Sequence, residues 1–229
     1  MATFRCARRR ATPLPSSFIR WQNRRQNMLD ARSPISFADG VLDPGVTQEL
    51  VDWLQHLQYR YYRITNKNEP EPFPIWHREL LGRDWPINQA SDYSCTPQFL
   101  QAQTGVLSVV WRSCMRALQL PVMTQCHGVY ANANTHGNEG NVHIDSQHPL
   151  DRTLLIYGVR HWQAGWGGET VFYDQEGRLQ GSVMPAPARV VFFAGHIRHG
   201  VNPISRACRD LRPVLVFKTR LQEPQKALS

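Results

Sequence analysis

His143 and Asp145 are a pair of residues whose types and spacing suggest metal chemistry. Side chains two residues apart on an extended strand point to the same face, so an imidazole and a carboxylate at this spacing can bind one ion. A third ligand must come from elsewhere in the chain. His199 lies 54 residues further on, and His136 and His196 are the competing histidines nearby.

Two imidazoles and one carboxylate on one face of a metal form the facial triad typical of non-haem iron sites, which leaves positions open on the ion. Those open positions are a chemical requirement, because a co-substrate and dioxygen must both reach the same iron. A His-x-Asp motif alone is weak support, since it also occurs by chance. The surrounding segments therefore decide whether the pair has a metal role.

The surroundings of the pair contain three further motifs in order. They are NANTHGNEGNVHIDS (132–146), TLLIYGVRHWQAGWGGETVFYD (153–174) and ARVVFFAGHIRHGVNPISRACRDLRPVLVFKT (188–219). Over about residues 120–220 the chain resembles the Fe(II)/2-oxoglutarate-dependent dioxygenases, specifically the prolyl-4-hydroxylase-like group. The shared features are the HxD, a downstream GGET, a VVFF strand leading to an HxVxP context, and a basic residue on the next strand.

The resemblance implies an α+β fold: a double-stranded β-helix (jelly-roll) core with N-terminal helices packed on one sheet. It implies iron(II) as the metal, 2-oxoglutarate as the co-substrate and dioxygen as the oxidant, with L-ascorbic acid as an associated reductant. It maps the iron ligands onto His143, Asp145 and His199. His199 is preferred over His196 and His136 because GVNPI follows it.

The distal carboxylate of 2-oxoglutarate needs a cation inside the barrel, best an arginine with its two-pronged guanidinium. The candidates in the C-terminal segment are Arg206, Arg209, Arg212 and Lys218. We favour Arg212, because it directly precedes an apolar run and shares a face with Val214 and Val216 at a period of two. Arg209 has the more usual offset from the distal histidine in such enzymes and is the alternative.

Three aromatic residues near these motifs are weaker candidates. In similar enzymes a tyrosine at the place of Tyr130 can hydrogen-bond the co-substrate, although a core aromatic with a bonded hydroxyl is an equal interpretation. Trp162 and Trp166 either line a substrate mouth or cap the core. We interpret Glu169, within the GGET motif, as structural.

The elements that must position these residues change in type along the chain. Asp43-Pro44 is a typical helix start, and apolar spacing predicts a helix over 44–61. A second helix is predicted from Thr96-Pro97 to about Leu118, after an irregular proline-containing loop over 64–94. Strands are then predicted over 123–131, 152–159, 169–174, 189–194 and 213–220, which together favour a sandwich or barrel.

The net charge of +8 for the 229 residues is concentrated at one end. Residues 1–27 hold seven arginines and no acidic residue, and subtracting them leaves +1 for the remainder. We predict a disordered basic segment over 1–27, or a true start at Met28, with an organelle transit peptide or an RNA-binding arm as the alternatives, and a single domain over 28–229. The near-neutral core predicts no nucleic-acid partner, and no apolar run is long enough to cross a membrane.

The predicted function is hydroxylation of an unactivated C–H bond of a small molecule, with release of succinate and CO2. The alternatives are a prolyl-type protein hydroxylase, a non-catalytic jelly-roll binding protein, and a nucleic-acid demethylase, for which only the basic segment speaks. A carboxylate at Asp145 argues against halogenation, since related halogenases have a small residue there. The odd number of cysteines, five without a CxxC motif, favours a reducing compartment, and we expect the cytoplasm.

Overall fold

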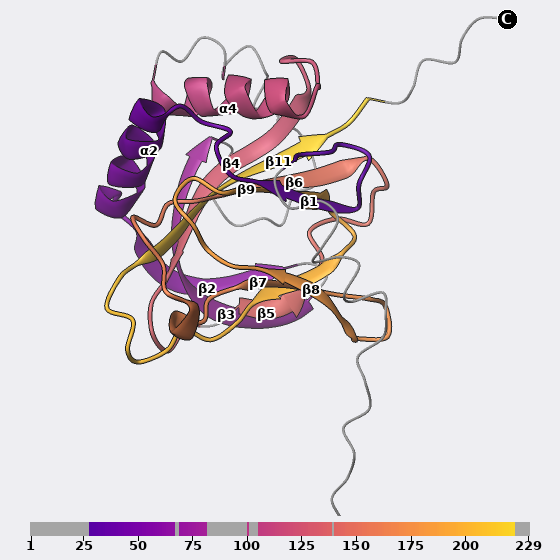
Figure 1. The fold of residues 1–229 in the computed structure, drawn as a ribbon. Helices are drawn as coiled ribbons and strands as arrows, with labels where there is room; N and C mark the ends of the chain where they lie inside the picture. Colours follow the sequence, from indigo (N-terminus) through magenta and orange to yellow (C-terminus); the bar gives the residue numbers. More distant parts are fainter. Residues whose placement is uncertain (1–27, 67–68, 82–99, 101–104, 139, 223–229) are drawn as a thin grey trace, which may run out of the picture.

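The structure is a computed structural model that describes residues 28–66, 69–81, 100, 105–138 and 140–222. In this part of the chain, two antiparallel β-sheets and two helices make up the fold (Figure 1). The helices are α2 (Pro44–His56) and α4 (Val106–Ala117), and a short 3-10 turn spans Ala164–Trp166. The strands are β1 (Ile35–Ala38), β2 (Arg60–Asn66), β3 (Glu69–Leu81), β4 (Gln125–Asn134), β5 (Gly140–His143), β6 (Asp151–Tyr157), β7 (Thr170–Tyr173), β8 (Leu179–Val183), β9 (Val190–Ala194), β10 (Arg198–Val201) and β11 (Arg212–Arg220).

The two sheets differ in size and are built from strands that alternate between them. The larger sheet has the order β1-β9-β6-β11-β4-β3-β2, and the smaller has the order β5-β10-β7-β8. From β4 onward the chain crosses repeatedly from one sheet to the other, so that consecutive strands seldom pair. This mostly antiparallel arrangement with two helices is consistent with the predicted jelly-roll core.

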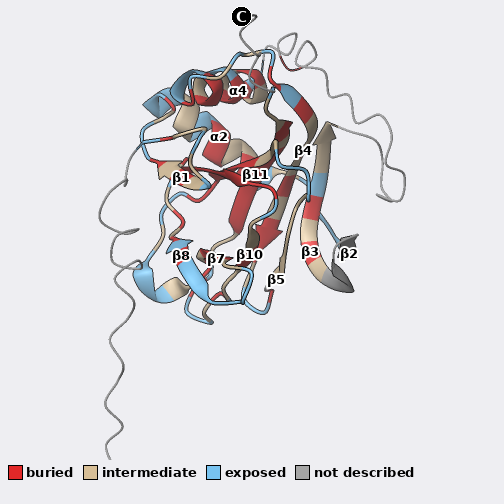
Figure 2. Cartoon of the chain, turned by 90° about the vertical axis from the view of Figure 1, so that its right-hand side faces the viewer, coloured by how far each residue is buried: buried red, intermediate tan, exposed pale blue. Residues whose placement is uncertain are grey.

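Strand β11 separates two hydrophobic cores, because its side chains alternate between its faces. Leu215 and Phe217 join one core with both helices, and the ring of Trp111 on α4 lies 5.4 Å from that of Phe217. Val214 and Val216 join the other core, which lies between the two sheets. Figure 2 shows β11 buried along most of its length. The strand is therefore packed on both sides, and its inward face points at the site.

The helix prediction over 44–61 ran too far. Helix α2 ends at His56, and the chain enters strand β2 at Arg60, because Tyr59 turns back to donate a hydrogen bond to the Leu54 carbonyl at 2.9 Å. The second predicted helix is present as α4, but it begins at Val106, because Gly105 has an extended backbone and interrupts the predicted helix. Thr96-Pro97 lies outside the described residues.

The irregular loop predicted over 64–94 was wrong where the structure describes it, since Glu69–Leu81 forms strand β3. Its prolines precede Ile75, whereas the pairing of β3 with the inner strand β4 begins at Trp76. Proline is therefore kept out of the stretch that needs hydrogen bonds on both sides. Strands β5, β8 and β10 were also not predicted, because each has four or five residues and they contain glycines.

No helix among the described residues is long and apolar enough to cross a membrane.

Candidate metal centre

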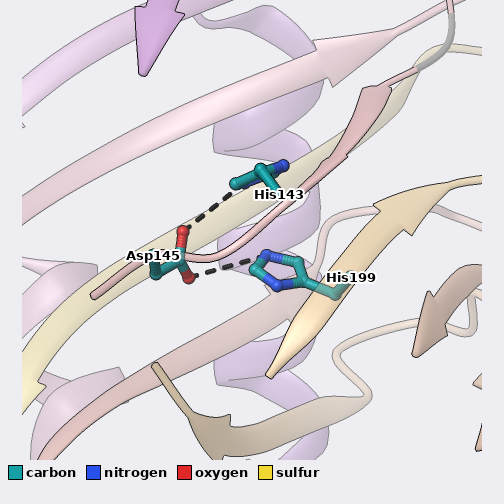
Figure 3. Close-up of side chains that lie close together, drawn as sticks. All are labelled: His143, Asp145 and His199. Atoms are coloured by element: carbon teal, nitrogen blue, oxygen red, sulfur yellow. Dashed lines mark ion pairs between the residues drawn. The ribbon is translucent and has the colours of Figure 1, made fainter. Parts of the chain in front are cut away.

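His143, Asp145 and His199 lie together at the edge of the smaller sheet (Figure 3). His143 ends β5, His199 lies on β10, and these two residues are direct partners in the pairing of the two strands. The Nε2 atom of His143 lies 3.5 Å from Asp145 Oδ1, and Nε2 of His199 lies 3.6 Å from Asp145 Oδ2. One ligand atom from each residue falls within 4.8 Å of the others, which fits one metal ion.

Both imidazoles are held in the form that a metal requires. His143 Nδ1 lies 2.8 Å from the Asn141 carbonyl, and His199 Nδ1 lies 2.9 Å from the Ile197 carbonyl. A carbonyl oxygen only accepts, so Nδ1 carries the proton in each ring and Nε2 keeps its lone pair. Hydrogen bonds of this kind orient metal-binding histidines and raise their basicity. The two nitrogens and one carboxylate are the donor set of a non-haem iron(II) site.

The Asp145 backbone is fixed by the turn after β9. The carbonyl of Gly195 accepts hydrogen bonds from the backbone N–H groups of Asp145, at 2.8 Å, and Ser146, at 3.0 Å. A methyl group on Gly195 would lie 3.2 Å from Ser146 Cβ, so the glycine permits this close approach. The carboxylate therefore leaves the strand at a set position although Asp145 itself lies beyond the end of β5.

The Asp145 carboxylate has two further partners, on the larger sheet. Lys218 Nζ forms an ion pair with Oδ2, and the Thr153 hydroxyl donates to the same oxygen at 2.5 Å. Lys218 and Thr153 are direct partners in the pairing of β11 with β6, which brings them to one place on the inward face. These contacts orient the carboxylate toward the two histidines.

Burial and charge set the protonation of the three residues. Burial alone would raise the pKa of Asp145, but Lys218 and the two imidazoles hold it well below its usual range. Burial lowers the pKa of His199 to about 4. Burial also lowers the pKa of His143, but Asp145 beside it outweighs that effect and raises the pKa above its ordinary value. At neutral pH the carboxylate is thus ionised and the buried His199 is neutral, as metal binding requires.

Arg212 opens β11 at the end of the barrel opposite Lys218, and its side chain is fully buried. Its guanidinium donates to the Gly168 carbonyl at 2.5 Å, to the Thr170 hydroxyl at 3.1 Å and to the Asn134 side-chain oxygen at 3.4 Å. Its carbon Cζ lies 5.0 Å above the ring of Tyr157. Within the part of the chain that the structure describes, Arg212 forms no ion pair with a carboxylate.

The other cations considered for this role lie elsewhere. Arg209 and Arg206 are exposed in the segment between β10 and β11. Lys218 lies beside the triad, where it pairs with Asp145. The competing histidines are also separated from the triad: His196 is exposed on the turn before β10, and His136 Nδ1 bonds the Ile204 carbonyl at 2.9 Å.

Tyr130 lies on β4, near both the triad and the inward face of β11. Lys218 Nζ lies 5.8 Å from the centre of its ring, and burial raises the pKa of its hydroxyl to about 12. Trp162 packs against the core between the sheets and donates to the Gly167 carbonyl at 2.8 Å, while Trp166 meets it edge-on at 5.2 Å. Glu169 accepts a hydrogen bond from Asn202 at 3.3 Å.

Sequence reasoning did not single out Thr153 and Tyr157, which contact Asp145 and Arg212 respectively. Both lie on β6, two positions either side of Leu155, so they share a face with it. The Tyr157 hydroxyl meets the Thr170 hydroxyl at 2.6 Å and donates to the Val183 carbonyl at 2.9 Å. A period of two counted along the predicted strand 152–159 would have placed both residues inward.

Comparison with known proteins agrees with this geometry. Residues 127–215 match the family model described as the 2OG-Fe(II) oxygenase superfamily. No curated protein has a sequence that matches the chain.

Several solved structures are similar in fold. One is an oxidoreductase of the 2OG-Fe(II) oxygenase family from Burkholderia pseudomallei, with 14% identity, 95% of this chain and 93% of that chain covered, and a TM-score of 0.56. Another is a prolyl-4-hydroxylase from Pseudomonas putida, with 17% identity, coverage of 84% and 95%, and a TM-score of 0.52. A third is a prolyl hydroxylase from Trichoplax adhaerens in complex with a hypoxia inducible factor peptide fragment, with 14% identity, coverage of 82% and 84%, and a TM-score of 0.52.

Proposed function

Because residues 127–215 match the family model of the 2OG-Fe(II) oxygenase superfamily, we propose that the chain hydroxylates an unactivated C–H bond of a small molecule. The observation that carries the proposal is the pairing of two sites in one barrel: a His-Asp-His triad beside β10 and a buried arginine at the start of β11. When bound, iron(II), 2-oxoglutarate and dioxygen supply the oxidising chemistry and release succinate and CO2. The protein supplies ligands, orientation and a pocket that excludes water.

The metal would be held by His143, Asp145 and His199. The two histidines need no change of tautomer to bind it, because Nδ1 of each ring already donates its proton to a backbone carbonyl and Nε2 is free of a proton. Phe193 supports the site from within the core, its ring 4.6 Å from that of His199. The ring fixes the imidazole plane and keeps water away from one side of the site.

We assign the distal carboxylate of 2-oxoglutarate to Arg212. A buried guanidinium is stable only where its charge is compensated, and carbonyl and hydroxyl oxygens supply part of that compensation. A carboxylate would complete it, and its two oxygens match the two-pronged geometry of the side chain. The Thr170 hydroxyl and the Tyr157 ring border the same place. Tyr130, nearer the triad, is the proposed contact for the other end of the co-substrate.

A small-molecule substrate is favoured over a protein by the near-neutral charge of residues 28–229. The Trichoplax structure holds a peptide, so hydroxylation of a protein segment is the second candidate. A screen of small molecules and of proline-containing peptides, with iron(II), ascorbate and 2-oxoglutarate and with succinate as the readout, separates the two. We also propose that α2 and α4 serve as backing for the larger sheet, which the contact of Trp111 with Phe217 supports.

The experiment that tests the proposal is anaerobic titration of the protein with iron(II) and 2-oxoglutarate. We expect a weak visible charge-transfer band that is absent in His143→Ala. The exposed His196→Ala, which also loses one histidine near β10, is the matched control and should keep the band. A protein that shows no band, or a band of equal strength in His143→Ala, would contradict the proposal and favour a non-catalytic jelly-roll.

A further inference from the structure

Lys218 is a partly buried cation to which the proposed function assigns no role. It lies on the inward face of β11, with a side chain only 24% exposed, and it is held by Asp145 and by the Thr153 hydroxyl at 3.1 Å. A lysine side chain is an ammonium at neutral pH, since its ordinary pKa is about 10.4. A permanent positive charge therefore borders the place where the substrate must approach the metal.

The charges around the proposed centre do not balance without a further anion. This count rests on the proposed function. The two positive charges of iron(II) are matched by Asp145 and by the 2-oxo acid end of the co-substrate, and Arg212 matches the distal carboxylate. A carboxylate that binds a divalent ion shares its charge with that ion, so Asp145 then compensates Lys218 less well. Lys218 forms no ion pair with another carboxylate among the residues that the structure describes.

Glu79, on β3, does not supply the missing charge. It is the register partner of Tyr130 on β4 and lies 3.4 Å from Nε2 of His77. His77 in turn contacts the Asn132 side chain at 2.6 Å. Besides Asp145, the described groups beside Lys218 are the Thr153 hydroxyl and the Tyr130 ring.

From this arrangement we infer that Lys218 anchors a carboxylate of the substrate, so that the enzyme acts on a small carboxylic acid. The Lys218 ammonium has three N–H donors and directs one of them to the Thr153 hydroxyl at 3.1 Å, so this hydroxyl orients the charge beside the anchored carboxylate. Because Lys218 also contacts the metal ligand Asp145, the anchored group sits close to the iron. The carbon that is oxidised is therefore only a few bonds from the substrate carboxylate.

The test measures binding without turnover, in protein loaded with manganese(II) and 2-oxoglutarate. The probes are carboxylic acids and their primary amides, which differ in charge at one place: L-proline and L-prolinamide, L-leucine and L-leucinamide, hexanoate and hexanamide. Calorimetry should show at least one acid binding about 10- to 100-fold more tightly than its amide, as a hydrogen bond to a charged group predicts. Succinate release with iron(II) is the second readout and should follow the same preference.

Three variants show whether Lys218 is the cause. Lys218→Met keeps the length of the side chain and should bind acid and amide equally, whereas Lys218→Arg should keep most of the preference. Arg178→Met removes one positive charge from an exposed turn, where Arg178 pairs with Asp174 and Glu176, and should change nothing. If Lys218→Met does not fold, Lys218→Arg and the wild-type comparison of acids with amides still decide the matter.

The failure of this inference is distinguishable from failure of the proposed function. If the charge-transfer band with iron(II) and 2-oxoglutarate is absent, the proposed function fails. If the band is present but no acid binds better than its amide, or if Lys218→Met discriminates as the wild type does, the assignment of Lys218 to the substrate is overturned. Loss of manganese affinity in Lys218→Met, with the preference for acids unchanged, would instead make Lys218 a positioning residue for Asp145.

Discussion

The two histidines of the proposed centre have different pKa values, although their hydrogen bonds to backbone carbonyls are alike. Asp145 raises the pKa of His143 above 6.5, while burial lowers that of His199 to about 4. Metal binding needs both imidazoles neutral, so protonation of His143 is the first event that competes with the metal. Manganese(II) affinity should be constant above the pKa of His143 and fall about tenfold per pH unit below it.

Calorimetric titration with manganese(II) between pH 8 and pH 5 measures this dependence. His148→Ala removes an exposed histidine near the same loop and should leave the profile unchanged. Affinity that stays constant down to pH 5 would show that His143 does not hold its proton as described.

Arg212 and Arg209 should differ sharply when each is replaced by alanine. Losing the partner of a buried carboxylate costs roughly 3–5 kcal/mol, so Arg212→Ala should raise the 2-oxoglutarate requirement about 100- to 4000-fold. Arg209 is exposed, and a surface charge is worth about 0–1 kcal/mol, so Arg209→Ala should change it only a few-fold. The measurement is the 2-oxoglutarate dependence of succinate formation, with iron affinity followed separately.

Arg212→Lys should restore part of the affinity, because an ammonium carries the charge but not the two-pronged geometry. The reverse order of the two alanine variants would transfer the role to Arg209.

At the residue scale, the sequence was sufficient to name a candidate site residue that belongs to a motif. It was insufficient to predict a contact between side chains on different strands. His143, Asp145 and His199 could be named from HxD and its downstream context. The contacts of Thr153 and Lys218 with Asp145 depend on the pairing of β6 with β11, which no local pattern reveals. A lysine near the end of an apolar strand is usually a solvated charge. A period of two places this one on the face of Arg212, but only the register brings it beside Thr153 and Asp145.

The turn before β7 is the element that shapes the Arg212 site. Gly168 has φ of 73°, and a methyl group there would lie 3.1 Å from Arg212 Cδ and 3.0 Å from the Trp162 ring. Gly168→Ala should therefore lower stability by about 1–2 kcal/mol through the left-handed backbone, and also weaken 2-oxoglutarate binding by displacing the arginine. Thermal unfolding and the 2-oxoglutarate requirement measure the two effects.

Gly177 offers a matched control for this prediction. It has φ of 77° in the turn before β8, with nothing within 4 Å of the added methyl group. Gly177→Ala should show a similar loss of stability with an unchanged 2-oxoglutarate requirement. Equal effects of the two variants on co-substrate binding would contradict a role for Gly168 in shaping the site.

At the element scale, long apolar segments were predictable and short ones were not. The predicted strands 152–159 and 189–194 correspond to β6 and β9, which lie inside the larger sheet and have a strong apolar pattern. Strands β5 and β10 carry two of the proposed metal ligands, yet they are four residues long and hold polar residues and glycines. Their strand conformation comes from pairing with each other and with β7, which is a tertiary effect that overrides local preference.

At the scale of the whole molecule, residues 1–27 should be dispensable. The described core begins with Leu29, which is 6% exposed and packs with both helices. A protein of residues 28–229, with a net charge near +1, should keep the thermal unfolding temperature and the 2-oxoglutarate affinity of the full chain. It should also lose any affinity for nucleic acid that the full chain shows at low salt.

Thermal unfolding, co-substrate titration and a nucleic-acid binding assay on the two proteins check this prediction. Nucleic-acid binding that survives the deletion would support the demethylase alternative.

The pairing of β1 with β9 has a consequence for the folding of the protein during its synthesis on the ribosome. Strand β1 is synthesised about 150 residues before its partner, which at ~5–20 residues per second is a delay of roughly 8–30 s. During that interval the apolar faces of α2 and α4 also remain unpacked, because β9 and β11, which complete their shared core, are synthesised late. Such late pairing of strands that are distant in sequence is slow and leaves aggregation-prone apolar surface exposed. The nascent chain should therefore depend on holding chaperones, and slower synthesis at low temperature should favour its recovery in soluble form.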